Sequence, residues 1–416
     1  MLKRWLQDYI EKWKKQKSLR GMIICGARQV GKTTLVRDAC REMEYVNLDD
    51  PLTHSEFEKM GGEEFAKSYK RTILDEVQKV PVLFNLIKYG LDTKSENRYM
   101  LLGSAQIILL EKIRESLAGR VIIKELYPLA FCERLADGPK PWIAGVMERF
   151  EDDGGAPELP SSKRVREIIS STSMEWKRHI SWGGMPAQTN IINEEEWKEW
   201  LRNYVAIYLQ RDLRDIARIS DLTPFRKCER LIALRSGCLL NYSELARDAG
   251  VSVQTIKNYC MYLDLTYQII IAEPYFTNLS KRLIKSPRVY MVDVGIQKIL
   301  SGQWGEITGQ QYESIIVSEL KKVLSVFHQD WHLYHLRTFD GFEVDFFIVK
   351  GDKAVAIEVK HGDKVHIQDA RHLQRIEEVT GIKQVLKFIV YEGREIVKLK
   401  EGIWGIPAIV FFGPAG

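Results

Sequence analysis

One short stretch constrains this chain more than any other feature. Gly26–Thr33 fits the pattern G-x-x-x-x-G-K-[ST], with the apolar run Met22–Cys25 directly before it and the helix-forming Thr34–Val36 directly after. Glycines in this arrangement let backbone N–H groups close around phosphates, while Lys32 reaches the β and γ oxygens and the Thr33 hydroxyl can ligate magnesium. The residues expected to contact the nucleotide are Gly26, Ala27, Arg28, Gln29, Val30, Gly31, Lys32, Thr33 and Thr34.

A pair of carboxylates ends a second apolar run. Ile73–Leu74 leads straight into Asp75 and Glu76. Asp75 can hold magnesium through water, and Glu76 can orient or deprotonate the water that attacks the γ-phosphate. A solvated strand end is the alternative interpretation. Taken with the glycine-rich loop, the pair predicts an ATPase that uses ATP and Mg²⁺.

Two further polar residues are candidates for the same site. Ser104 follows the apolar run that ends at Gly103, which would place its hydroxyl near the γ-phosphate as a sensor. Arg120 could act as an arginine finger for this subunit or a neighbouring one. Arg114 competes for that role, and a surface salt bridge explains Arg120 equally well.

Short apolar runs alternate with helical patterns from Arg20 to about Cys132. This rhythm predicts a parallel α/β sheet. Further on, Glu151–Lys163 is rich in Gly, Pro and Ser and predicts a loop or hinge, and Gly309 begins a separate α+β pattern. The expected strands of the first sheet are Met22–Cys25, Tyr45–Leu48, Thr72–Leu74, Tyr99–Leu102 and Val121–Lys124.

Length and composition set the remaining limits. A chain of 416 residues is too long for one ordinary core, and a net charge of +5 does not by itself indicate a nucleic-acid binder. The six cysteines form no C-x-x-C pair and are expected to be reduced. The basic amphipathic helix that begins near Leu2 is expected to pack on the next domain rather than on a membrane. With no apolar secretion segment or membrane span, we expect a cytoplasmic protein.

Residues Ser243–Ser252 fit a helix-turn-helix pattern, with Ala246 and Gly250 four positions apart before a capping Ser252. In the following helix, Val253, Ile256, Cys260 and Leu263 are expected to form the buried stripe. The expected readers of duplex DNA are Gln254, Thr255, Lys257 and Asn258, with Lys281, Arg282, Lys285 and Arg288 on a wing that contacts phosphates. Such modules also dock proteins or transmit domain motion, so those alternatives remain open.

An acidic pattern begins at Asp345, and Glu358 and Lys360 follow on a second apolar run. An Asp followed by Glu-x-Lys on an adjacent strand is the metal-binding pattern of restriction-endonuclease-like folds. The carboxylates would hold magnesium, Lys360 would polarise the attacking water, and Glu313 on an upstream helix could complete the site. Arg337 is expected to be a phosphate contact or a salt bridge. Loss of cleavage with retention of the fold is the alternative.

These residues resemble a known group, the prokaryotic AAA-type ATPases that carry a C-terminal region of poorly defined function. The departures are Ala27 for the usual Pro, Ala105 for Ser and Val294 for Thr. The resemblance implies an ATP-binding core, a winged helix and a nuclease-like tail. The stretches that carry it are Gly26–Thr34, Ile73–Gln78, Gly103–Ser104, Ser116–Arg120, Gly183–Pro186, Asn241–Ala246 and Lys281–Pro287.

We therefore expect a multidomain α/β protein with four parts. They are an AAA-type P-loop core with a parallel sheet and an N-terminal helix (1–135), a helical lid or linker (136–220), a winged helix-turn-helix (221–300) and an α+β restriction-endonuclease-like domain (301–416). One reading is an ATPase that acts on DNA with an active nuclease domain. The other is a nucleotide-dependent switch whose C-terminal domains bind DNA or protein without cleavage. A homo-oligomer is compatible with both.

Overall fold

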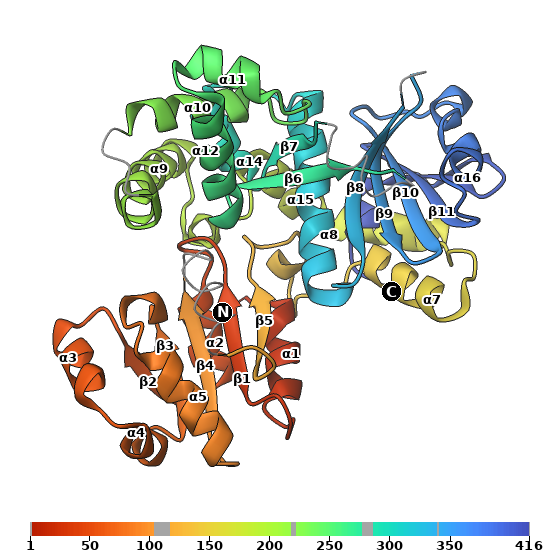
Figure 1. Cartoon of the computed structure of the whole chain (residues 1–416). Coiled ribbons are helices and arrows are strands. Elements are labelled where there is room, and N and C mark those ends of the chain that lie inside the picture. The colour runs from red at the N-terminus through yellow and green to blue at the C-terminus, as the bar shows by residue number, and fades with distance from the viewer. Residues whose placement is uncertain (1, 104–116, 218–221, 277–285, 339–340, 416) are drawn as a thin grey trace.

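The computed structural model describes residues 2–103, 117–217, 222–276, 286–338 and 341–415, and the side chains of 208–217 are not described. Its first part is a parallel sheet with strand order β2-β3-β4-β1-β5 (Figure 1). β1 and β4 are buried along their whole length, as parallel strands covered on both faces should be. All five strands expected from the sequence are confirmed, as β1 Gly21–Cys25, β2 Glu44–Asn47, β3 Arg71–Asp75, β4 Arg98–Gly103 and β5 Val121–Glu125.

Helices surround this sheet. The apolar stripe of α1 is buried at Trp5, Leu6, Ile10 and Trp13, so the expectation that this helix packs on the following domain is confirmed. The helices of this part are α1 Trp5–Trp13, α2 Lys32–Ala39, α3 Pro51–Lys59, α4 Gly62–Ser68 and α5 Leu83–Thr93, with a 3₁₀ turn at Val77–Lys79.

The second sheet is mixed and has the order β12-β13-β11-β10-β9-β8-β6-β7. β9 and β10, which carry Asp345 and Glu358, are neighbours as expected, and they run antiparallel. β6 and β7 form the edge of this same sheet, so strand pairing crosses the division expected at residue 300. The strands are β6 Ile269–Pro274, β7 Arg288–Met291, β8 His332–Arg337, β9 Glu343–Lys350, β10 Lys353–Lys360, β11 Gln384–Tyr391, β12 Val397–Lys400 and β13 Ile403–Pro407.

Two helices of the expected lid or linker region lie against this second sheet (Figure 1). They are α7 Trp142–Asp153 and α8 Ser162–Trp182, and both contact the C-terminal helix α17 Ala408–Phe411. The Trp142 ring meets Phe388 edge-on at a centroid distance of 5.8 Å. The apolar faces of α7 and α8 thus pack on the C-terminal core, and the assignment of residues 136–220 to a helical lid or linker stays a prediction.

The helical module comprises α10 Thr223–Leu234, α11 Tyr242–Ala249 and α12 Val253–Leu265. The turn between α11 and α12 uses Gly250 at φ 76°, and the Ser252 hydroxyl caps α12 by accepting from the Thr255 N–H, as expected. Val253 is exposed and Tyr259 is buried, which corrects the expected stripe. The buried residues of α12 are Ile256, Tyr259, Cys260 and Leu263. Val253 lies in the first turn of α12, and it can face the solvent because the buried stripe need not begin directly after the cap residue.

One helix, α15 Gly309–Phe327, touches both sheets. Its Glu319 carboxylate accepts a hydrogen bond from the Phe131 N–H (2.9 Å) and lies 2.8 Å from the Lys322 ammonium and 3.0 Å from His179 Nε2. This buried cluster joins the first sheet's domain to α8 and α15. The remaining helices are α9 Glu194–Ala217, α14 Val294–Ser301 and α16 Ile376–Thr380, with 3₁₀ turns at Cys132–Arg134, Pro186–Asn190, Ile367–Ala370 and Leu373–Arg375.

Candidate functional site

The glycine-rich loop joins the end of β1 to the start of α2. Close packing explains Gly26, because a Cβ at this position would lie 2.1 Å from the Leu126 carbonyl oxygen. Gly31 has φ 90° and Gln29 has φ 59°, so the loop is held in a left-handed conformation that is unusual for Gln29. Strain of this kind is typical of a backbone shaped to hold a ligand.

Lys32 and Thr33, the loop residues expected to bind the phosphates and magnesium, lie at the start of α2. The Lys32 ammonium is buried and donates to the carbonyl oxygens of Gly26 (2.9 Å) and Ala27 (2.8 Å). Phosphate oxygens can take over these bonds, because the ammonium already lies inside the loop. Thr33, the next residue, lies at the amino end of the helix, where its hydroxyl can ligate magnesium.

The Thr33 hydroxyl donates to the Asp75 carboxylate at 2.6 Å. The Tyr45 hydroxyl donates to the same carboxylate oxygen at 2.9 Å. Tyr45 could not be predicted as part of this site, because only the pairing of β2 with β3 brings it there. Burial, followed by the charge of Asp75, raises the pKa of the Tyr45 hydroxyl, which stays a proton donor. A threonine hydroxyl beside a carboxylate is a set of hard oxygen ligands that suits Mg²⁺.

Glu76 directly follows Asp75 and adopts φ 59°, a left-handed conformation. Gln78 donates to the Glu76 carboxylate through its side-chain amide. Both carboxylates line the same cavity as the glycine-rich loop. The structure therefore places Lys32, Thr33, Asp75 and Glu76 together.

Arg4 also supports the loop, although sequence patterns identify it only as a basic residue in the N-terminal segment. Its guanidinium donates to the Val30 carbonyl (2.8 Å) and the Tyr127 carbonyl (2.7 Å), and it lies 3.1 Å from the Glu133 carboxylate. These contacts tie the segment before α1 to the loop and to the chain after β5.

The loop borders a cavity of about 750 Å³ whose other wall includes Leu2, Leu129, Ile207 and the segment Pro186–Asn190. The turn before this segment is held by Asp293, which accepts from the Gly184 N–H at 2.6 Å. A Cβ at Gly183 would lie 2.2 Å from an Asp293 oxygen, which explains this glycine. The cavity is large enough for a nucleotide.

Of the two remaining candidates, Arg120 is described and lies away from this cavity. Ser104 lies outside the described residues, directly after β4. Arg120 pairs with Asp92, its Nε 2.6 Å from Oδ1. It precedes Val121, which pairs with Gly21 at the start of β1, so it lies at the edge of the sheet opposite the loop, roughly 13 Å along the strands. Arg120 therefore cannot serve as an arginine finger for its own chain's nucleotide.

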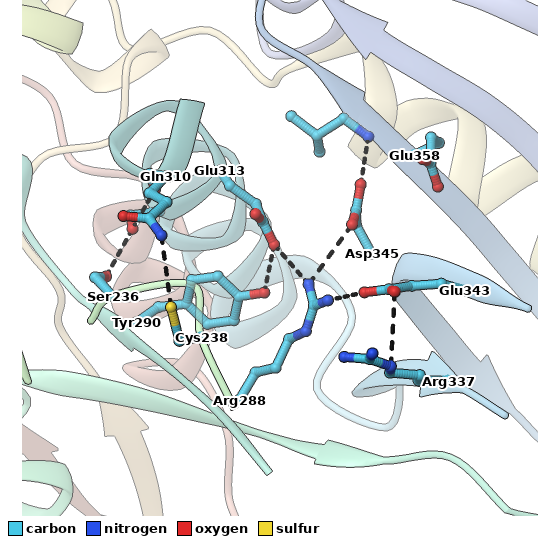
Figure 2. A network of polar contacts seen from close by, with 12 residues as sticks. Ser236, Cys238, Arg288, Tyr290, Gln310, Glu313, Arg337, Glu343, Asp345 and Glu358 are labelled. Carbon is cyan, nitrogen blue, oxygen red and sulfur yellow. Dashed lines mark hydrogen bonds and ion pairs between the residues drawn. The ribbon is translucent and has the colours of Figure 1, made fainter. Parts of the chain in front are cut away.

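A second cluster of charged side chains joins β7, β9 and α15 (Figure 2). The Arg288 guanidinium lies 2.9 Å from the Glu313 carboxylate and 3.6 Å from Asp345, and it is also paired with Glu343. Asp345 accepts from the Val359 N–H at 2.8 Å. Glu343 lies two residues before Asp345 on β9, so both side chains point to the same face of the strand. Arg288 was expected on the DNA-contacting wing; this is corrected, because its strand β7 places it among the carboxylates.

Glu358 lies at the rim of this cluster, with Lys360 3.0 Å away. Burial and the neighbouring Asp345 raise the pKa of Glu358 to about 8 and that of Glu313 to about 7. Within the described residues, no group of three or more His, Cys, Asp or Glu side chains is placed to hold a metal ion. The carboxylates of Glu313 and Asp345 face Arg288 instead, so these residues do not fit the magnesium centre expected from the sequence.

The candidate DNA readers lie on the first turns of α12. Gln254 and Lys257 are exposed, and Thr255 and Asn258 are half-buried. The Lys257 ammonium lies 5.7 Å from the centre of the Tyr242 ring. The other candidates, Lys281, Arg282 and Lys285, lie outside the described residues.

Three domain families match consecutive parts of the chain. Residues 19–135 match an AAA domain, residues 173–305 a domain of unknown function (DUF8612), and residues 308–410 another domain of unknown function (DUF4143). The AAA match contains the glycine-rich loop, the acidic pair and all five strands of the parallel sheet.

Two of the relatives that match this chain are uncharacterised proteins. An uncharacterised protein of Mycobacterium tuberculosis is 25% identical over 410 residues, which cover 93% of this chain and 80% of that protein. An uncharacterised protein of Methanocaldococcus jannaschii is 22% identical, over 69% of this chain and 60% of that protein. Among solved structures, a Walker-type ATPase of Pyrococcus abyssi is 14% identical with a TM-score of 0.45, covering 72% of this chain and 96% of that one.

The loop geometry and the AAA match define the class of this region: residues 19–135 form an AAA-type P-loop ATPase domain. Further helices and a mixed sheet follow it in the C-terminal region. None of the helices in the described parts of the chain is long and apolar enough to cross a membrane.

Proposed function

We propose that this protein binds ATP with Mg²⁺ in the cavity beside Gly26–Thr34 and hydrolyses it. The observation that carries the proposal is the 2.6 Å hydrogen bond between the Thr33 hydroxyl and the Asp75 carboxylate. These two side chains come from separate elements, α2 and β3. Their meeting point beside Lys32 and Glu76 suits a P-loop ATPase site.

Each residue has a distinct role in this proposal. Lys32 exchanges its bonds to the Gly26 and Ala27 carbonyls for bonds to the β and γ oxygens of ATP. Thr33 and Asp75 would hold Mg²⁺, whose charge stabilises the phosphates when it is bound. Glu76 accepts a proton from the attacking water, or orients that water.

Phosphate release from ATP, measured with and without Mg²⁺, tests this proposal. Lys32→Ala should abolish nucleotide binding, because the Lys32 ammonium already lies inside the loop, on the Gly26 and Ala27 carbonyls, where the phosphates are expected. Glu76→Gln should retain binding and slow hydrolysis about a hundredfold or more. Lys70→Ala, which alters an exposed lysine before β3, is the matched control and should hydrolyse at the wild-type rate. Equal hydrolysis by the wild type and Lys32→Ala would rule the site out.

We further infer that the helical module binds duplex DNA as a winged helix. The order α10, α11, α12 and then the antiparallel pair β6–β7 is that of a winged helix-turn-helix. Gln254 and Lys257 lie on the exposed face of α12, the second helix of the α11–α12 helix-turn-helix. An exposed helix of this kind can enter the major groove, and Lys257 can neutralise a phosphate.

Fluorescence anisotropy with a labelled duplex, measured over a salt series, tests DNA binding. Lys257→Ala should weaken binding and reduce the slope of log K against log salt by about one, because one phosphate contact is lost. The control is Lys177→Ala on α8, which removes an equally exposed lysine away from α12. If the two variants bind alike, α12 does not contact DNA.

For the C-terminal region, we propose a restriction-endonuclease-like fold that acts without cleavage. The fold is supported by α15 preceding the β8–β9–β10 meander, followed by β11 parallel to β10. The Arg288 guanidinium among the acidic side chains favours the reading as a nucleotide-dependent switch. Plasmid incubated with the protein, ATP and Mg²⁺ should remain intact. Nicking that Asp345→Ala abolishes would instead establish a nuclease.

A further inference from the structure

Arg288 reaches the acidic cluster from a different part of the chain. It opens β7, which follows the helical module and lies at the edge of the second sheet. The carboxylates that surround it belong to α15 and β9 (Figure 2). Only 8% of Arg288 is exposed, so its charge depends on these partners rather than on water.

The guanidinium occupies the position between the carboxylates. One of its terminal nitrogens lies 2.9 Å from Glu313 and 3.6 Å from Asp345, and the other is paired with Glu343. A divalent ion held by Glu313 and Asp345 would stand next to this fixed positive charge. It would also take away partners that a buried guanidinium needs.

A neighbour on the same strand strengthens the attachment. The Tyr290 hydroxyl donates to the same Glu313 oxygen at 2.7 Å. Further along β7, the Met291 N–H donates to the Ser236 hydroxyl, which is 2.7 Å from the Ser314 hydroxyl of α15. The contacts of β7 with α15 thus continue beyond the acidic cluster.

We propose that Arg288 is the resident cation of this cluster, excluding divalent metal from it and fastening the helical module to α15 and β9. The acidic side chains that resemble a metal centre therefore serve as an attachment site for β7. This assignment is independent of ATP hydrolysis, because the cluster shares no residue with the lining of the nucleotide cavity.

Mn²⁺ binding to the nucleotide-free, full-length protein, followed by electron paramagnetic resonance, tests this assignment. Each protein is also measured with Asp345→Asn added. The Mn²⁺ binding that this substitution removes is the binding that occurs at the cluster. The wild type should show no Mn²⁺ binding that depends on Asp345. Arg288→Gln should gain an Asp345-dependent site that binds Mn²⁺ about tenfold or more tightly than any such site in the wild type, because a competing positive charge is gone.

Two variants serve as controls. Arg337→Gln removes an arginine at the rim of the cluster, 3.8 Å from Glu343, and should leave Mn²⁺ binding as in the wild type. Arg288→Lys keeps a positive charge and should gain no site. Should Arg288→Gln fail to fold, as circular dichroism would show, the wild type still decides the matter. Asp345-dependent Mn²⁺ binding by the wild type, or its absence from a folded Arg288→Gln protein, would overturn the proposal.

Discussion

At the scale of single residues, the nucleotide cavity depends on contacts between side chains that are distant in sequence. Thr33 and Tyr45 both donate to one oxygen of Asp75, at 2.6 and 2.9 Å. Tyr45 is not among the residues that line the nucleotide cavity, yet its hydroxyl holds the carboxylate that would bind magnesium. Such supporting hydrogen bonds orient a metal ligand before the metal arrives.

Tyr45→Phe should therefore change the requirement for magnesium more than the requirement for ATP. Loss of the hydroxyl leaves the Asp75 oxygen with fewer donors, and roughly tenfold more Mg²⁺ should be needed for half-maximal hydrolysis. Titration of Mg²⁺ at saturating ATP measures this. Tyr69→Phe removes a hydroxyl that donates to the exposed Glu56 and should have no effect. An unchanged Mg²⁺ requirement in Tyr45→Phe would contradict the supporting role.

At the scale of elements, four aromatic rings connect α8 and α9. Trp182, Trp197, Trp200 and Tyr204 stack in sequence, with centroid distances of 6.1, 5.0 and 5.3 Å and interplanar angles of 12° or less. The Tyr204 hydroxyl lies 3.5 Å from the Arg28 carbonyl, so the stack ends beside the glycine-rich loop. Offset stacking adds to the stabilisation that burial provides.

Trp197→Ala should destabilise the protein by about 3–5 kcal/mol, because its fully buried ring fills the middle of this stack. The substitution also removes the hydrogen bond from the indole N–H to the Trp182 carbonyl. Urea unfolding measures the loss. In the half-buried Trp200, replacement by Phe keeps a ring in the stack and should cost about 1.5 kcal/mol or less. If Trp197→Ala costs no more than Trp200→Phe, the stack does not contribute to stability as its burial suggests.

The elements themselves could be predicted far better than their partners. Apolar runs and caps gave the five strands of the first sheet, the α11–α12 turn and the strand positions of Asp345 and Glu358, because these are local patterns. α7 and α8 were expected in a lid or linker region, and local periodicity says only that a helix has an apolar face, not which sheet that face covers. Arg288 could not be assigned to the cluster for the same reason, since β7 pairs with β6 and only the folded sheet brings it to Glu313.

At the scale of the whole molecule, α15 is the structural link between the ATPase domain and the C-terminal sheet. Glu319 accepts from the Phe131 N–H of the first region and contacts Lys322 on its own helix and His179 on α8. Burial alone would raise the pKa of Glu319, but Lys322 and then His179 lower it to about 2. Burial lowers the pKa of His179, which is therefore neutral at neutral pH, so Lys322 supplies the balancing charge.

Glu319→Gln should therefore weaken the link between the two halves. The substitution leaves the buried Lys322 without its countercharge and should cost about 3–5 kcal/mol at neutral pH. A folded-state pKa below the ordinary 4.5 means that the carboxylate's contribution is fully present above about pH 5 and declines as the pH falls toward 2. The difference in urea stability between wild type and variant should therefore shrink between pH 5 and pH 3. Glu167→Gln, at an exposed site on α8, should show no such difference. A cost for Glu319→Gln that stays constant across this pH range would mean that its charge does not hold the two halves together.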